Sequence, residues 1–184
     1  MGTKKISTNR LVLRKLCLKD SVQMFDNWGS DSKVTKFLTW KPYKNIDSVN
    51  HYLSLVTNNY CSEDYFHWGI EIKDTHTLIG TISVVNYHKR IQTMEIGYAI
   101  GRRWWNQGYT SEALSEVVNY LFAETTIQRI EAFHDTNNPN SGLVLNKCQF
   151  VFEGILRKRG KNNCGIVDEC IYSILRQEST KTAI

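Results

Sequence analysis

Two spacings of hydrophobic residues alternate along the chain, and they predict strands and helices in turn. Leu11, Leu13 and Leu16 stand among polar residues and predict a first strand. Alternating or clustered apolar residues predict further strands over residues 66–72, 78–86, 93–100, 129–134, 150–158 and 165–175. Polar turns separate these segments.

Apolar residues three and four positions apart predict helices between the strands. The first predicted helix carries Val22, Phe25 and Trp28 and ends at Gly29, and the second carries Val49, Tyr52, Leu53 and Val56. The third begins near Thr110 and has an apolar face of Ala113, Leu114, Val117, Val118, Leu121 and Phe122. The fourth covers residues 140–147. Asp20 and Asp47 precede the first two helices and are candidate N-caps.

The resulting order, β-α-α-β-β-β-α-β-α-β-β, predicts an α/β fold with a mixed, mostly antiparallel central sheet flanked by helices. In the chain, the antiparallel strands at the centre of this sheet are followed by a β-α-β unit. No internal repeat and no long linker divides the chain, so residues 1–184 are expected to form a single domain.

Composition excludes several classes of protein. Of the 184 residues 41% are hydrophobic, yet no apolar run approaches the ~20 residues that a membrane helix needs. The first ten residues lack the apolar core of a signal peptide, so we expect a cytoplasmic protein without membrane contact. The five cysteines form no CxxC pair and the five histidines are scattered, which argues against a metal site.

The formal net charge is +5, which suits phosphate-bearing ligands as well as ribosomal or nucleic-acid surroundings. Arg157, Lys158, Arg159 and Lys161 form the densest basic cluster and are predicted to be the turn between the last two strands. A solvated hairpin tip and a ligand-binding role are both open for this cluster.

The strand and turn around residues 93–110 combine features that a ligand-binding site requires. Alternation over residues 93–100 places Glu95, Gly97 and Ala99 on one strand face, where two small residues allow a ligand to approach closely. A turn containing Gly108 follows, and then a helix begins. Backbone N–H groups and the helix dipole make such a junction an anion site, although many structural helices begin in the same way. No P-loop and no GxGxxG pattern is present.

The same segment resembles the acetyl-CoA-binding motif of the GNAT superfamily of N-acetyltransferases. The resemblance rests on Glu95-Ile-Gly-Tyr-Ala-Ile and on Trp105-Asn-Gln-Gly-Tyr-Thr-Ser-Glu-Ala-Leu, with Gly108 on the central glycine. Asn138-Pro-Asn-Ser141 through Lys147-Cys-Gln-Phe150 is similar to the second signature of the superfamily. Thr8-Asn-Arg-Leu-Val-Leu-Arg14 is similar to the start of its ribosomal-protein N-terminal acetyltransferase branch. The likeness extends over residues 7–176.

This resemblance implies a GNAT-like acyl-CoA N-acyltransferase fold and an enzyme that moves an acetyl group from acetyl-CoA to a primary amine by direct attack. The pantetheine arm is implied to lie along the backbone of Tyr98, Ala99 and Ile100. The implied cofactor residues that follow are Trp105, Asn106, Gln107, Gly108, Tyr109, Thr110, Asn138 and Ser141. Thr110 and Gln149 depart from the small residues of the pattern.

The resemblance implies two catalytic groups: a base that takes a proton from the attacking amine, and a group that donates a proton or hydrogen bond to the departing CoA thiolate. Glu95 is the first candidate for the base and Glu131 the second, with an ion pair as the competing role for Glu131. Ser141 matches the serine that this branch places near the CoA sulfur, since Leu145 stands where many members have a tyrosine. Helix capping competes for Ser141, and a turn role competes for Asn138.

A triad of His134, Asp135 and Ser141 is disfavoured, because adjacent strand residues point to opposite faces. Four aromatic residues are candidates for the acceptor groove, with a core role as the alternative: Trp28, Trp40, Tyr43 and Trp68. Of these, only the loop of Trp40 and Tyr43 is expected to be exposed.

Several functions stay open at this point. The acceptor is a protein N-terminus or a small amine such as a polyamine or an amino sugar. A CoA-binding sensor without catalysis is the competing class, and nucleic-acid binding ranks last because no RNA-binding motif is present. A homodimer is compatible with the sequence, which does not define the oligomeric state.

Overall fold

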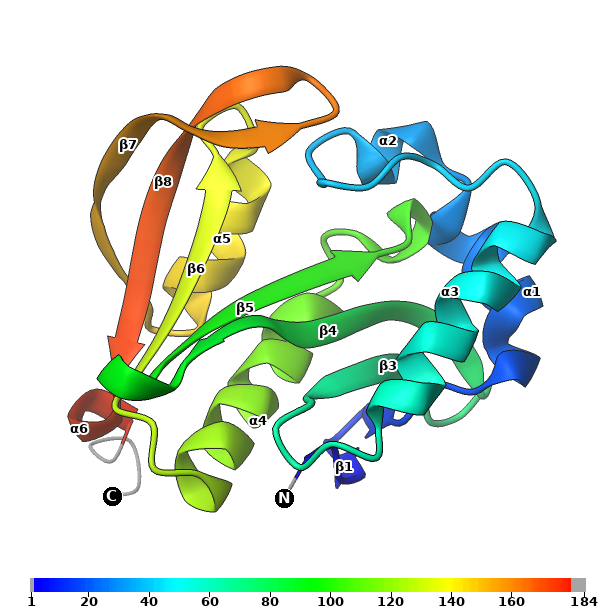
Figure 1. Ribbon diagram of the computed structural model, residues 1–184, viewed down its shortest axis with the longest axis horizontal. Helices are drawn as coiled ribbons and strands as arrows, with labels where there is room; N and C mark the ends of the chain where they lie inside the picture. The colour runs from blue at the N-terminus through cyan, green and yellow to red at the C-terminus, as the bar shows by residue number, and fades with distance from the viewer. Residues whose placement is uncertain (1, 180–184) are drawn as a thin grey trace.

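The structure is a computed structural model that describes residues 2–179, and it contains one eight-stranded sheet with helices on both faces (Figure 1). The strands are β1 (Ile6–Ser7), β2 (Leu11–Arg14), β3 (His67–Ile72), β4 (Thr77–His88), β5 (Thr93–Ile100), β6 (Arg129–Asp135), β7 (Val151–Asn162) and β8 (Gly165–Leu175). The α-helices are α1 (Ser21–Met24), α2 (Ser32–Thr35), α3 (Ile46–Asn59), α4 (Tyr109–Glu124), α5 (Pro139–Lys147) and α6 (Arg176–Ser179). Short 3-10 or π turns are η1 (Leu18–Asp20), η2 (Phe25–Gly29), η3 (Lys89–Ile91) and η4 (Arg102–Trp104).

The strands follow the order β1-β2-β3-β4-β5-β6-β8-β7, which confirms the predicted mixed, mostly antiparallel sheet. Among the described strands, every neighbouring pair is antiparallel except β5 and β6. The helix α4 connects that parallel pair, because parallel neighbours require a crossover. The strands and helices predicted from residue 66 onward match the observed ones, apart from shifts at their ends.

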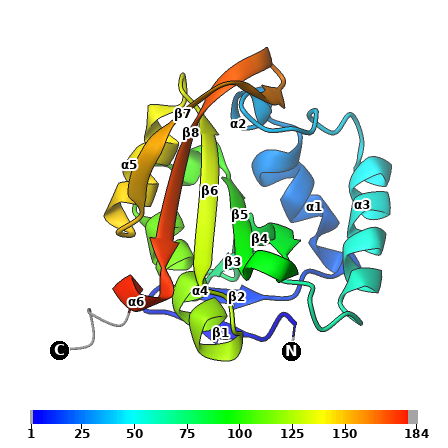
Figure 2. The ribbon, with the colours of Figure 1, turned by 60° about the vertical axis from the view of Figure 1, so that its left-hand side comes forward.

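Two hydrophobic layers hold the sheet between the helices (Figure 2). One layer packs α4 and α5 against the sheet and includes Trp68, Ile70 and Leu114. The other packs α1, η2 and α3 against the opposite face and includes Trp28 and Leu53. The alternation of side chains along each strand supplies both layers.

The first predicted helix is irregular. It passes from the 3-10 turn η1 through α1 into the π turn η2, so its residues do not share one face. Trp28 is fully buried, whereas Val22 is 54% exposed. A π turn adds a residue to the helix and rotates the following side chains, which the 3.6-residue spacing does not anticipate.

Neither predicted cap makes a side-chain capping hydrogen bond to its helix. Helix α3 begins two residues earlier than Asp47 implies, because Asn45 is the N-cap and its side chain accepts a hydrogen bond from the Ser48 N–H at 3.0 Å. Asp20 stands at the N-cap position of α1, but its side chain accepts no hydrogen bond from that helix. Its carboxylate accepts instead from the Cys17 N–H at 2.8 Å. Its main partner is Arg14, which binds it through two nitrogens, each at 2.9 Å.

The predicted basic turn also needs correction. Residues 157–161 belong to strand β7, which continues to Asn162, so the turn itself is formed by Asn163 and Cys164. The β7–β8 ladder shifts register between Leu156 and Gly160, and Lys158 adopts a left-handed φ of 54° there. The hairpin is therefore longer than the hydrophobic pattern suggests, because polar and basic residues continue the strand.

The Arg14–Asp20 pair fastens η1 to the sheet, since Arg14 also binds Glu71 on β3 at 2.5 Å. Asp20 is 4% exposed. We predict that Asp20→Ala lowers the free energy of unfolding by about 3 kcal/mol, because the substitution leaves a half-buried guanidinium with one partner fewer. Urea denaturation measures this change. Asp26→Ala, an exposed residue of the adjacent turn, is the control and should change stability by less than about 0.5 kcal/mol; equal effects would contradict the prediction.

Candidate active site

The pairing between β5 and β6 is short, and the two strands diverge beyond it (Figure 1). The ladder joins residues 93–95 of β5 to residues 129–131 of β6 and ends there. On its other edge β5 stays paired with β4 as far as Ile100. Within residues 2–179, the β5 backbone from residue 96 to residue 100 thus has no strand partner on the β6 side. An extended ligand can hydrogen-bond to this edge as an added strand.

The three residues predicted to hold an extended arm, Tyr98, Ala99 and Ile100, all lie on this edge. The Ile100 carbonyl already accepts a hydrogen bond from the Trp105 indole N–H at 2.9 Å. This bond folds Trp105 back onto the end of β5. The structure thus gives Trp105 a part in shaping the loop that the sequence did not indicate.

The loop after β5 leads directly into the longest helix, α4. Gly108 stands at the N-cap of α4 with a left-handed φ of 79°, and Asn106 is also left-handed at 60°. The predicted loop residues 105–110 therefore wrap around the start of the helix. Unpaired N–H groups and the positive end of the dipole favour an anion at this place.

Arg10, to which the sequence assigned no role, ties this loop to β2. Its guanidinium donates to the Gln107 carbonyl at 3.0 Å and to the Glu112 carboxylate at 2.7 Å, and it lies 4.3 Å from the centre of the Tyr109 ring. Burial tends to raise the pKa of Glu112, but hydrogen bonds from Thr8 and Arg10 outweigh it and hold that pKa below its usual value. These contacts join residues about a hundred positions apart, so no local motif reveals them.

A pocket of about 290 Å³ lies over the start of α4. Its walls include Arg10, Gly108, Ser111 and Lys147. A Cβ atom on Gly108 would lie 3.4 Å from Arg10 Nη2 and 3.7 Å from Lys147 Nζ, so two cations flank the glycine. Together with the helix terminus, they make the pocket attractive to phosphate groups.

Glu95 lies at the point where β5 and β6 separate, opposite Glu131 in the parallel ladder. Among the described residues, Glu95 has no hydrogen-bond or ion-pair partner. Burial raises its pKa above the usual value, the Arg159 guanidinium opposes this rise, and Glu131 and Glu169 add to it. An unpartnered carboxylate with a raised pKa is suited to accept a proton near neutral pH.

Glu131 is held in an ion pair. Its carboxylate accepts from Arg129 Nε at 3.0 Å, and the other two nitrogens of Arg129 bind Glu153 at 2.7 and 2.5 Å. Hydrogen bonds from Arg129 hold the pKa of Glu153 at about 2. The ion-pair role considered for Glu131 thus describes its observed state, and Glu95 is the freer of the two candidate bases.

Ser141 lies in the first turn of α5 and faces β5. Its Oγ is 2.9 Å from the Tyr98 hydroxyl, which also donates to the Ser141 carbonyl at 3.3 Å. Asn138, not Ser141, occupies the N-cap position of α5, and the Asn138 carbonyl accepts from the Ser141 N–H at 3.1 Å. Capping therefore does not account for the Ser141 side chain, which is instead oriented by the partly buried Tyr98.

The disfavoured triad is not assembled. His134 Nδ1 donates to the backbone carbonyl of Asp135 at 2.8 Å, so no carboxylate orients its ring. The Asp135 side chain accepts hydrogen bonds from Asn137 and Asn162. Within residues 2–179, moreover, no group of three His, Cys, Asp or Glu side chains is arranged to hold a metal ion.

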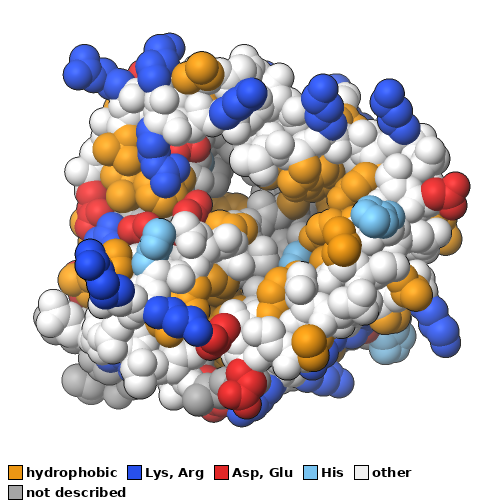
Figure 3. All heavy atoms as spheres, in the orientation of Figure 1, with side chains coloured by type: hydrophobic (Ala, Val, Ile, Leu, Met, Phe, Trp, Pro, Cys, Tyr) orange, Lys and Arg blue, Asp and Glu red, His pale blue; other side chains and the backbone are white. Residues whose placement is uncertain are grey.

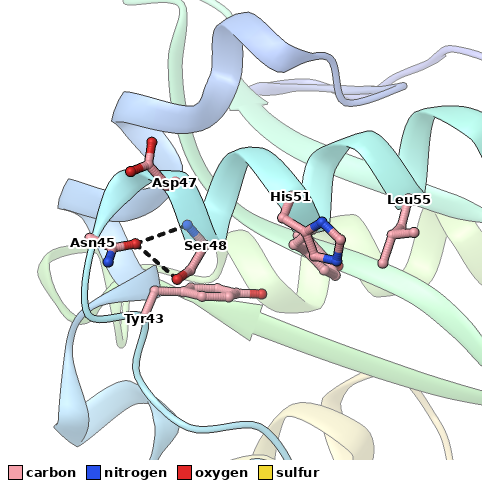
Figure 4. A pocket seen from close by; sticks show the side chains of 7 residues that line it. Tyr43, Asn45, Asp47, Ser48, His51 and Leu55 are labelled. Carbon is pink, nitrogen blue, oxygen red and sulfur yellow. Dashed lines mark hydrogen bonds between the residues drawn. The ribbon is translucent and has the colours of Figure 1, made fainter.

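The aromatic candidates divide into two groups. Trp28 and Trp68 are fully buried, so the core role considered for them is the observed one. Trp40 stacks on Tyr43 at 5.3 Å, and Tyr43 lines a pocket of about 640 Å³ with residues of α3. Figure 4 shows the Tyr43 ring beneath the start of α3, pointing toward His51.

Comparison with known proteins places these features in a family. A family model described as an acetyltransferase (GNAT) domain matches residues 10–151. An uncharacterised N-acetyltransferase of Bacillus subtilis, YoaA, is 32% identical over 171 residues, which cover 93% of this chain and 96% of the relative. The ribosomal protein uS5-alanine N-acetyltransferase of Escherichia coli is 25% identical over 158 residues, covering 82% and 79% of the two chains.

A solved structure supports the fold. The ribosomal L7/L12 alpha-N-protein acetyltransferase RimL, determined in complex with coenzyme A, superposes with a TM-score of 0.84 at 16% identity. The superposition covers 94% of this chain and 98% of the other. No helix among residues 2–179 has both the length and the apolar character to cross a bilayer.

The environment of Glu95 leads to a prediction about its titration. In a ¹³C NMR titration of the carboxyl groups, the pKa of Glu95 should lie above the ~4.3 of an ordinary glutamate, because burial removes water from the carboxylate. Arg159→Gln should raise this pKa further, because it removes a cation that favours the charged form. Arg157→Gln, on the same strand, should leave it unchanged. A Glu95 pKa at or below 4.3 (the ordinary value) would contradict the proposed environment.

Proposed function

The chain belongs to the GNAT family of N-acetyltransferases, and we propose that it uses acetyl-CoA to acetylate a primary amine, the α-amine of a polypeptide N-terminus. One observation carries this proposal: beyond Glu95 the described edge of β5 has no strand partner on the β6 side, and the chain that follows β5 leads to the N-terminus of α4, where Gly108 is the N-cap. An extended arm on the edge and a phosphate group at the helix terminus fit this arrangement together.

The residues of this chain fit acetyl-CoA at both ends. Within the described residues, the β5 edge at residues 98–100 has no strand partner on the β6 side and can take the pantetheine arm, and residues 105–110 surround the proposed site for the pyrophosphate. Arg10 and Lys147 add positive charge beside Gly108. Bound acetyl-CoA supplies an acetyl group activated as a thioester.

The proposed base is Glu95, which stands where the arm would end. An α-amine has a pKa of ~7.7–8.0, so one carboxylate suffices to take its proton near neutral pH, whereas a lysine-like amine at ~10.4 needs more help. Glu131 is the less suitable base because Arg129 occupies it. The lower pKa of an α-amine, together with the alanine N-acetyltransferase activity named for the E. coli relative, supports an α-amine as the acceptor.

Ser141 is proposed as the donor to the departing sulfur. When the Tyr98 hydroxyl turns its single proton from the Ser141 carbonyl to Ser141 Oγ, the serine proton is free to point toward the thiolate. Burial raises the pKa of Tyr98, so the tyrosine orients Ser141 as a hydrogen-bond donor and keeps its own proton. Asn138, at the start of the same helix, is proposed to contact the arm.

The test is calorimetric titration with acetyl-CoA, followed by a free-thiol assay with N-terminal peptides, polyamines and amino sugars. We expect binding and CoA release that depends on a peptide. Gly108→Val should weaken binding strongly, because a side chain is strained at a φ of 79° and enters the phosphate site. Release with small amines alone would replace the peptide by a small acceptor, and binding without release would favour a sensor.

Substitution of Glu95 tests the assignment of the base. Glu95→Gln should lower kcat by roughly 10²–10⁴ and remove the acidic limb of the pH–rate profile. In the unaltered enzyme activity should fall as the pH drops through the raised pKa of Glu95, because the protonated carboxyl cannot accept a proton. Glu131→Gln is the matched variant and should keep this limb. The reverse pattern would assign the base to Glu131.

A further inference from the structure

The positive charge of this protein is concentrated in two segments that are distant in sequence. Residues 32–45 contain Lys33, Lys36, Lys41 and Lys44 and no acidic residue. Residues 155–164 contain Arg157, Lys158, Arg159 and Lys161, again without an acidic residue. These eight cations exceed the net charge of +5, so the rest of the chain carries a net charge of −3.

The two segments touch. The Asn163 side-chain amide, at the tip of the β7–β8 hairpin, donates to the Thr35 and Trp40 carbonyls, each at 2.8 Å. Cys164 adds a weaker contact of its thiol with the Lys36 carbonyl at 3.5 Å. Figures 1 and 2 both show the hairpin tip reaching across to α2. We call the joined residues 32–45 and 155–164 the basic strip.

Most charges of the basic strip have no carboxylate near them. Arg159 pairs with Glu169 at 2.6 Å. The other nearby acids are engaged: Asp31 binds Arg102 at 3.1 Å, and Asp168 accepts the Lys158 backbone N–H at 2.8 Å. The remaining seven cations are exposed and have no ion-pair partner among the described residues. Figure 3 shows Lys and Arg side chains along the upper edge of the molecule, on both sides of a hollow.

Three carboxylates, those of Glu95, Glu131 and Glu169, lie near one another where β5 and β6 separate, and we call them the acidic wall. Among the described residues, Glu95 lies there without a hydrogen-bond or ion-pair partner of its side chain, whereas Arg129 pairs with Glu131 and Arg159 pairs with Glu169. Glu95 is therefore the carboxylate of this wall that is left to attract a cation. A positively charged amine is attracted to this wall, whereas a positively charged body is repelled by the strip. The strip and the wall together therefore match a molecule with a cationic end and an anionic body.

We propose that the acceptor is a polypeptide whose free N-terminus is followed by acidic residues, which bind the basic strip while the α-amine reaches Glu95. The proposal rests on the proposed function. A polyamine, positive along its whole length, lacks the anionic body. Nucleic acid would satisfy the strip but offers no aliphatic amine to the acidic wall.

The sheet register indicates where the acidic residues would lie. Glu131 pairs with Ser173 and Lys161 pairs with Ile166 along the same strand β8. Seven strand residues span roughly 23 Å at ~3.3 Å each. An extended acceptor whose amine is at Glu95 would therefore place about its fifth to eighth residues on the basic strip.

The test compares three ten-residue peptides that share their first four residues and carry Glu, Gln or Lys at positions five to eight. We expect kcat/KM to follow the order Glu, Gln, Lys. The preference for Glu over Gln should shrink as NaCl rises, because exposed charges are screened beyond ~10 Å at 0.1 M salt. Equal rates for the three peptides would overturn the proposal while leaving the acetyltransferase in place.

A triple substitution tests the basic strip directly. Lys36→Gln, Arg157→Gln and Lys158→Gln together should reduce the Glu-over-Gln preference by about tenfold, as expected from three exposed ion pairs. Lys5→Gln, Lys15→Gln and Lys19→Gln remove the same charge from exposed positions near β1, β2 and η1 and should keep the preference. An equal loss in both variants would reduce the effect to net charge and overturn the assignment.

Two further outcomes separate the competing ligands. A ten-nucleotide single-stranded RNA should inhibit acetylation of the Glu peptide no better than an N-terminally blocked Glu peptide. Stronger inhibition by the RNA would make the basic strip a nucleic-acid surface and overturn the proposal. Turnover of polyamines without turnover of any peptide would overturn both this proposal and the proposed N-terminal activity.

Discussion

The candidate active site depends on how far the two parallel strands β5 and β6 stay hydrogen-bonded to each other. Strands β5 and β6 share three pairs of residues, and then each follows its own antiparallel partner, β4 or β8. Sheet twist separates strands that lose their common hydrogen bonds. A free backbone edge, a half-buried carboxylate at the fork and the packing of α5 against Tyr98 all follow from this separation.

The same fork explains why the acid and the hydroxyl occupy different sides of β5. Alternation sends Glu95 toward the layer of α1 and α3 and Tyr98 toward α4 and α5. Ser141 meets Tyr98 from the second side. A ligand lying along the edge between the two layers is thus within reach of a proton acceptor from one side and a hydrogen-bond donor from the other.

Elements with a strong, regular pattern could be predicted from the sequence. The alternation of β5 predicted both of its ends, and the apolar face of α4 predicted the helix and its start to within one residue, because both elements have a local periodicity and a buried face. The π turn before Gly29 could not be predicted, since a single added residue leaves no compositional sign. Alternation along β5 singled out the face of Glu95, whereas the resemblance to the GNAT motif supplied the other candidate site residues on β5 and its loop, and these stay predictions. Arg10 and the hydroxyl of Tyr98 were not assigned, because their roles depend on partners 97 and 43 positions away.

Trp105 gives the protein an optical property. Its indole N–H binds the last carbonyl of β5 and its ring is 37% exposed, whereas Trp28 and Trp68 are fully buried and Trp104 is 9% exposed. Indole emission depends on the polarity around the ring, so a change at the end of β5 would alter the fluorescence of Trp105 against a background from the other tryptophans, of which only Trp40 lies outside the buried core. The loop that is proposed to bind acetyl-CoA thus carries its own fluorophore, and binding of acetyl-CoA can be followed in real time without a label.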